Sequence, residues 1–197
     1  MTQINLRDLT VMTIKDPAQA ARYLLALGLG REVLWLGLLL AVVLNTMLQA
    51  ASNLLLPVIG FELQGITPSL VVYAAIVGGG LVVTTFAFCH VGRLLGGRGT
   101  FYDVMVLMVW MQFLKVVVQA AGLILVLTIP ILSAVLAFAA FLVGLYITVH
   151  FIDQAHRLNS PARAVGVLIA SVLAVAIVSF ILLSLVGGPI PGSAAYV

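Results

Sequence analysis

The residue whose chemistry stands out in this sequence is Lys115, because it lies inside a long apolar run that starts near Val104. At about 1.5 Å per helical residue, Lys115 lies about 16 Å along that run. A lysine stem of about 6 Å cannot carry the ammonium group out of it, so the charge needs partners there. The carboxylates lie in the amino-terminal segment, in loops or at the borders of the apolar runs: Asp8, Asp16, Glu32, Glu62, Asp103 and Asp153.

Neutral amide side chains remain as partners for this lysine. Two helical faces carry such polar groups: Asn45, Gln49 and Asn53 on one, and Gln112, Lys115 and Gln119 on the other. We predict a direct contact between these helices, with Asn45 level with Lys115 and Gln49 level with Gln119. The cluster either stabilises the packing of the helices through hydrogen bonds between them or lines a groove that binds an anionic headgroup or solute.

Histidines and aspartates near the ends of the apolar runs could form a second reactive cluster: His90, Asp103, His150, Asp153 and His156. Nitrogen and oxygen donors of this kind can hold a metal ion. Residues of these types are also common at membrane borders, and no His-Glu-x-x-His motif is present, so we expect no metal and no cofactor. The sequence has no nucleophile motif or phosphate-binding glycine loop, which predicts a protein that is not an enzyme.

The elements that hold these residues must be membrane helices. The chain has 197 residues, of which 63% are hydrophobic and 8% are charged, and its mean hydropathy is +1.28. Soluble domains are about one quarter charged, so a water-soluble globular domain is excluded, and nucleic-acid binding has no support. The one cysteine, Cys89, cannot form a disulfide within the chain.

Five helices of membrane-spanning length are predicted, since each crossing needs about 20 apolar residues. They occupy residues 33–56, 69–91 and 164–186, with two more in the block 104–149. That block is too long for one crossing, and Pro130 near its middle favours a tight hairpin at Thr128-Ile129-Pro130. We therefore predict an all-α polytopic membrane bundle of five transmembrane helices over residues 33–186.

Lysine and arginine in short loops indicate the side of the membrane on which those loops lie. With five spans, eight of the nine cations fall on one side: Arg7, Lys15, Arg22, Arg31, Arg93, Arg98, Arg157 and Arg163. This predicts a cytoplasmic amino-terminal segment at residues 1–32 and an external tail at residues 187–197. Asp16-Pro17 is typical of a helix start, and we expect an amphipathic helix there that lies in the membrane interface.

Small residues recur on one face of each of the last two spans. They are Ala137 and Gly144 on the fourth span, and Gly166, Ala170 and Ala174 on the fifth. Small side chains allow helix backbones to approach closely in a membrane. We expect these faces to pack within the bundle, with contact between copies in a homo-oligomer as the alternative.

The segment His-Val-Gly-Arg-Leu-Leu-Gly-Gly-Arg-Gly-Thr-Phe at residues 90–101 resembles the Yip family, membrane proteins named for interaction with Ypt/Rab GTPases. The likeness covers residues 10–187, through the third span, the proline turn and Ala162-Arg163-Ala164. Gly99-Thr100-Phe101 is similar to the family's Gly-Thr-Tyr segment. The resemblance implies a five-span membrane adaptor in a short, bacterial form. It does not imply a Rab partner, because an Asp-Leu-Tyr-Gly-Pro motif is absent.

We therefore expect a non-enzymatic adaptor or organiser in a bacterial cytoplasmic (inner) membrane. Its partners would be membrane lipids and a membrane or cytoplasmic protein whose identity the sequence leaves open. The expected contact surface is the second cytoplasmic loop with its borders: His90, Arg93, Arg98, Gly99, Thr100, Phe101 and Asp103. The alternative function is a carrier of a small solute or lipid, scramblase-like, with a polar path around Lys115.

Overall fold

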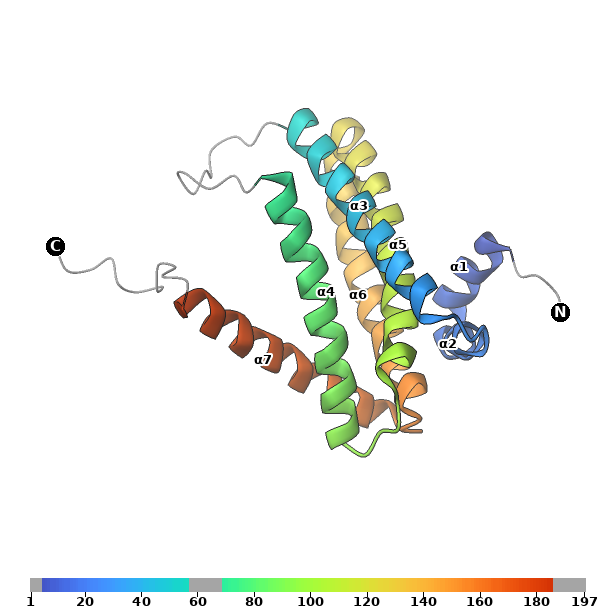
Figure 1. Ribbon diagram of the computed structural model, residues 1–197. Coiled ribbons are helices and arrows are strands. Elements are labelled where there is room, and N and C mark those ends of the chain that lie inside the picture. Colours follow the sequence, from blue (N-terminus) through green and yellow to red (C-terminus); the bar gives the residue numbers. More distant parts are fainter. Residues whose placement is uncertain (1–4, 57–68, 186–197) are drawn as a thin grey trace.

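The computed structural model describes residues 5–56 and 69–185, which form seven helices and no strand. Two short helices come first, α1 (Leu6–Lys15) and α2 (Pro17–Ala26). Five long apolar helices follow: α3 (Arg31–Leu55), α4 (Leu70–Leu94), α5 (Phe101–Thr128), α6 (Pro130–His156) and α7 (Pro161–Leu185) (Figure 1). The all-α class and the five candidate spans are confirmed, whereas the predicted outer loop at residues 57–68 and the tail at 187–197 lie outside the described residues.

The helix ends lie where local sequence signals place them. Pro130 occupies the first position of α6, where a missing backbone N–H breaks no helical bond, so one residue, Ile129, separates α5 from α6. The Asp16 carboxylate accepts a hydrogen bond from the backbone N–H of Gln19 at 2.9 Å, which caps α2 as predicted. The preceding helix α1 was not predicted.

The central helix of the bundle is α5, which packs on α2, α3, α4 and α6. Helix α7 packs on α4 and α6 and then leads away from the other helices (Figure 1). The most completely buried large side chains, among them Met105, Phe151 and Val167, lie in the half where α4 joins α5 and α6 joins α7. The other half exposes apolar side chains, as expected of helices that face lipid.

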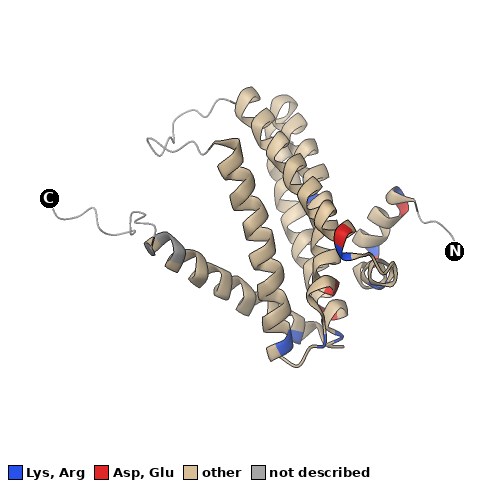
Figure 2. Ribbon diagram, in the orientation of Figure 1, with Lys and Arg blue, Asp and Glu red and all other residues tan. Residues whose placement is uncertain are grey.

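Apart from Lys115, the described lysines, arginines, aspartates and glutamates lie in one half of the bundle, which we call the charged end. It comprises the α4–α5 turn and the α6–α7 turn, together with α1 and α2, which lie beside this part of the bundle (Figure 2). Eight of the nine lysines and arginines lie on these elements or at the adjoining helix ends, and Lys115, in the middle of α5, is the exception.

Helices α1 and α2 are fixed to the bundle at this end. The Trp110 indole N–H of α5 donates a hydrogen bond to the Thr13 hydroxyl of α1 at 3.0 Å. An Arg22 guanidinium N–H of α2 donates to the side-chain carbonyl of Gln154 in α6 at 3.3 Å. Ala20 and Ala21 are fully buried, so the apolar side of α2 faces the bundle.

Candidate functional site

Amide side chains of α3 and α5 meet inside the membrane-spanning region, as predicted. The Asn45 side-chain N–H donates to the Gln119 side-chain oxygen at 3.1 Å. The Tyr73 hydroxyl of α4 donates to the Asn45 side-chain oxygen at 2.9 Å. Farther along α3, the Gln49 side-chain N–H donates to the Asn53 side-chain oxygen at 2.9 Å. Three helices are thus linked by one polar network.

The predicted register of this contact is wrong by one helical turn. Asn45 pairs with Gln119 rather than lying level with Lys115, and Gln49 bonds within its own helix. The two helices approach closely at Gly37, where an added Cβ would lie 3.1 Å from a Val109 methyl group. The register depends on how the two helices pack, and counting residues from the helix starts does not reveal it.

Lys115 has an exposed side chain in the wall of two cavities. The larger, of about 570 Å³, lies between α1, α3, α5 and α6, and the smaller, of about 240 Å³, between α4, α5, α6 and α7. Gln112 is buried in α5 and lines the smaller one. None of the described residues that line either cavity is an aspartate or a glutamate.

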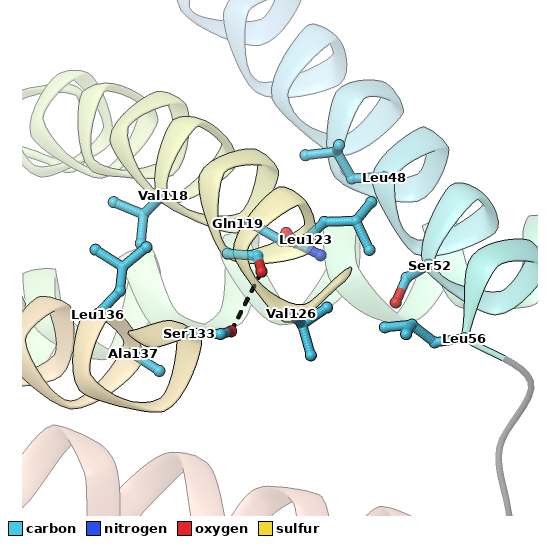
Figure 3. A pocket seen from close by; sticks show the side chains of 11 residues that line it. Leu48, Ser52, Leu56, Val118, Gln119, Leu123, Val126, Ser133, Leu136 and Ala137 are labelled. Carbon is cyan, nitrogen blue, oxygen red and sulfur yellow. Dashed lines mark hydrogen bonds between the residues drawn. The ribbon is translucent and has the colours of Figure 1, made fainter. Parts of the chain in front are cut away.

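A third cavity, of about 340 Å³, lies nearer the end opposite the charged end (Figure 3). It is lined by Ser52 of α3, Gln119 of α5 and Ser133 of α6, with apolar side chains around them. The Ser133 hydroxyl donates to the Gly122 backbone carbonyl at 3.2 Å, so its proton is already used within the protein. This cavity shares Gln119 and Val118 with the larger Lys115 cavity, which makes the two neighbours along α5.

At the charged end, the α4–α5 turn is built around His156 at the end of α6. His156 is 1% exposed, and its Nε2 lies 2.8 Å from the Phe88 carbonyl oxygen, to which it donates. The Arg98 backbone N–H donates to the His156 carbonyl at 2.9 Å. A Cβ added at Gly92 or Gly99 would overlap the imidazole ring. The glycines of the predicted loop motif therefore make room for a histidine that lies far away in the sequence.

The remaining residues of the predicted loop surface divide into structural and exposed groups. Thr100 and Asp103 form a capping box at the start of α5. The Asp103 backbone N–H donates to the Thr100 hydroxyl at 3.2 Å, and the Thr100 backbone N–H donates to the Asp103 carboxylate at 2.9 Å. The Arg93 guanidinium donates to the Gly99 carbonyl at 2.9 Å, while Arg98 is exposed. Phe101 is half-buried and packs against the core.

His90 is exposed and stacks on the Phe86 ring, with the ring centroids 4.0 Å apart.

The histidines and aspartates that could have formed a metal site are used in other ways. The Asp153 carboxylate accepts a hydrogen bond from the Ser160 backbone N–H at 2.9 Å, and so fixes the α6–α7 turn. His150 Nδ1 lies 2.9 Å from the Tyr146 carbonyl of its own helix. Within residues 5–56 and 69–185 no three His, Cys, Asp or Glu side chains are grouped closely enough to hold a metal ion.

The predicted small-residue faces of α6 and α7 differ in their surroundings. Ala137 is exposed beside the cavity of Figure 3, and an added Cβ at Gly144 would meet no heavy atom within 4 Å. Gly166, Ala170 and Ala174 are half-buried, beside the fully buried Ala164 and Val167 of α7. On α6 the small residues therefore leave space instead of allowing a close crossing.

Sequence reasoning missed three residues that organise these sites: Tyr73, Trp110 and Gly37. Each is a single residue in an apolar helix, with no periodic pattern around it to set it apart. For Tyr73 and Trp110 the residue type itself was a signal, since tyrosine and tryptophan inside a bundle need hydrogen-bond partners for their O–H and N–H groups.

Comparisons with known proteins agree with this architecture. The family model described as the Yip1 domain matches residues 12–183, which includes part of α1, all of α2 to α6 and most of α7. No curated protein and no solved structure matches the chain. Because the family match covers most of the chain and the five apolar helices fit it, this membrane protein belongs to the Yip1 domain family.

Proposed function

We propose that this protein is a non-enzymatic membrane adaptor whose contact surface is its charged end. The observation that supports this proposal most directly is an exposed patch of apolar and cationic side chains at the α4–α5 turn. Leu94 is 84% exposed and Leu95 is 45% exposed, and Arg93 and Arg98 flank them. Exposed leucines beside arginines suit contact with a protein partner or with the headgroup region of a membrane.

The patch is presented on a fixed support. His156, the three glycines at positions 92, 97 and 99, and the Thr100–Asp103 capping box hold the turn in one conformation. A surface that is already ordered loses little conformational entropy on binding, which favours recognition by a partner. Membership of the Yip1 domain family supports an adaptor role for such a surface.

The proposed orientation places the charged end in the cytoplasm of a bacterial cell, with α1 and α2 in the interface of the inner membrane. The support is the positive-inside rule, since all eight cations other than Lys115 lie at this end. Short helices with arginine and lysine on the outer side and apolar residues on the other suit that interface.

Photo-crosslinking tests the adaptor role. A photoreactive residue at position 94 or 98 is expected to capture one discrete protein in intact cells, identified by mass spectrometry. The same group at Ile131, which is 78% exposed at the opposite end, serves as the matched control. Arg98→Glu should abolish capture at position 94 because it reverses the charge of the patch. Capture of lipid alone at both turn positions would contradict the proposal.

A further inference from the structure

The larger Lys115 cavity combines an apolar wall with a lysine that has no acidic neighbour in its lining. Its volume of about 570 Å³ lies within the range of about 300–1,000 Å³ that is typical of small-ligand sites. Most of the lining is aliphatic, including Leu114, Val143 and Ile147, which suits a hydrocarbon chain. Thr10 and Ile14 of α1 border the cavity on the side of the charged end.

The polar part of the cavity is suited to an anion. Lys115 and Gln119 are four residues apart on α5, so they lie on the same helical face, and both line the cavity. The Gln119 side-chain oxygen accepts a hydrogen bond from Asn45, and the Asn45 side-chain oxygen accepts one from Tyr73. No described residue accepts a hydrogen bond from the Gln119 amide nitrogen. An anionic group there would meet an ammonium group and an amide donor together.

The space exists because two small residues of α6 face α5 there. Ala140 and Gly144 line the cavity, and an added Cβ at Gly144 would meet no heavy atom within 4 Å. The cavity of Figure 3 adjoins it along α5 at the shared Val118 and Gln119. A hydrocarbon chain therefore has room beyond the polar groups.

We propose that this cavity binds an anionic phospholipid of the surrounding membrane, with Lys115 and Gln119 on its phosphate and the aliphatic wall on an acyl chain. Charge complementarity selects the headgroup, since an ammonium group in the membrane-spanning region, with no carboxylate among the residues that line its cavity, needs an anion. The apolar wall selects a lipid over a soluble anion. This site depends on neither the adaptor role nor the carrier role that the sequence left as an alternative.

Native mass spectrometry of the full chain in mild detergent tests the site, with dioleoyl phosphatidylglycerol and dioleoyl phosphatidylcholine as probes. The wild-type protein is expected to bind phosphatidylglycerol at least about fivefold more tightly. Lys115→Met should remove that preference. Gly144→Leu should weaken binding of both lipids because leucine fills the cavity, while Ala139→Leu, on the exposed side of α6, should leave both unchanged.

Three results would overturn the site: an unchanged preference in Lys115→Met, unchanged phosphatidylglycerol binding in Gly144→Leu, or displacement of the lipid by inorganic phosphate. The last would indicate a site for a soluble anion. If Lys115→Met does not yield folded protein, Gly144→Leu decides, because it keeps the charge. Lost binding in that variant supports the site, and full binding contradicts it.

Discussion

At the scale of single residues, His156 explains the glycine-rich turn better than any ligand-binding role. Its Nε2 donates to the Phe88 carbonyl, and Gly92, Gly97 and Gly99 pack against its ring or its Cβ atom. Among the described residues Nδ1 has no hydrogen-bond partner, because it lies against the glycine backbone. A side chain that fills space between three backbone segments fixes the turn through packing.

Gly92→Ala should destabilise the protein by about 1–3 kcal/mol or more, since the added methyl group overlaps the His156 ring. Thermal unfolding in detergent measures the loss. Gly79→Ala, in the same helix and with open space around it, is the control and should be neutral or slightly stabilising. The double variant Gly92→Ala with His156→Ala should be more stable than the sum of the single effects predicts. Strict additivity would show that the two residues do not meet.

At the scale of elements, α1 is the helix that makes the fewest residue contacts with the other helices. It buries Leu9 and Thr13, and the Thr13 hydroxyl both donates to the Leu9 carbonyl at 2.8 Å and accepts from Trp110 at 3.0 Å. The hydrogen bond between Trp110 of α5 and α1 therefore depends on one hydroxyl group. Docking of α1 matters because this helix borders the Lys115 cavity.

Thr13→Val keeps the shape of the side chain but removes the acceptor for the Trp110 indole. An unpaired buried N–H costs about 1–3 kcal/mol, so α1 should detach more often. Hydrogen exchange should become about tenfold faster in residues 6–15 and stay unchanged in α5. Thr10→Val is the control, because the hydrogen bond that the Thr10 hydroxyl makes to a described residue goes to the Leu6 carbonyl of its own helix. Equal protection of α1 in both variants would show that the Trp110 bond does not hold the helix.

At the scale of the whole molecule, the uneven distribution of charge is the basis of the proposed orientation. Arginines lie at the end of α4, in both turns at the charged end and at the start of α7, and cations in short loops resist translocation. With five spans, the proposed orientation puts the two termini on opposite sides of the membrane.

Single cysteines in a Cys89→Ser background test this orientation with a membrane-impermeant thiol reagent on intact cells. Cysteine at positions 62 and 196 should be labelled, and cysteine at positions 98 and 157 should be protected until the membrane is permeabilised. Arg98 and Arg157 are both exposed on the structure, so protection would reflect the membrane and not burial. Labelling of position 157 from outside would show that the α5–α6 hairpin does not return the chain to the cytoplasm.

The sequence by itself determined the number of spans, the hairpin at Pro130, the start of α2 and the uneven distribution of charge. These features depend on local quantities: the length of an apolar run, a missing backbone donor, a capping side chain and the count of cations in loops. The presence of amides on facing sides of α3 and α5 was also readable, because polar residues inside apolar helices must find partners.

Only the tertiary structure decided which of these groups meet. Helices that are apolar on nearly every side, such as α4, α6 and α7, carry no stripe that indicates which face turns inward. The pairing of Asn45 with Gln119 depends on how α3 packs on α5, and the fit of His156 against three glycines joins segments far apart in the chain. Such contacts depend on the rotation and tilt of each helix, which are set by packing against the others and not by the residues of one helix alone.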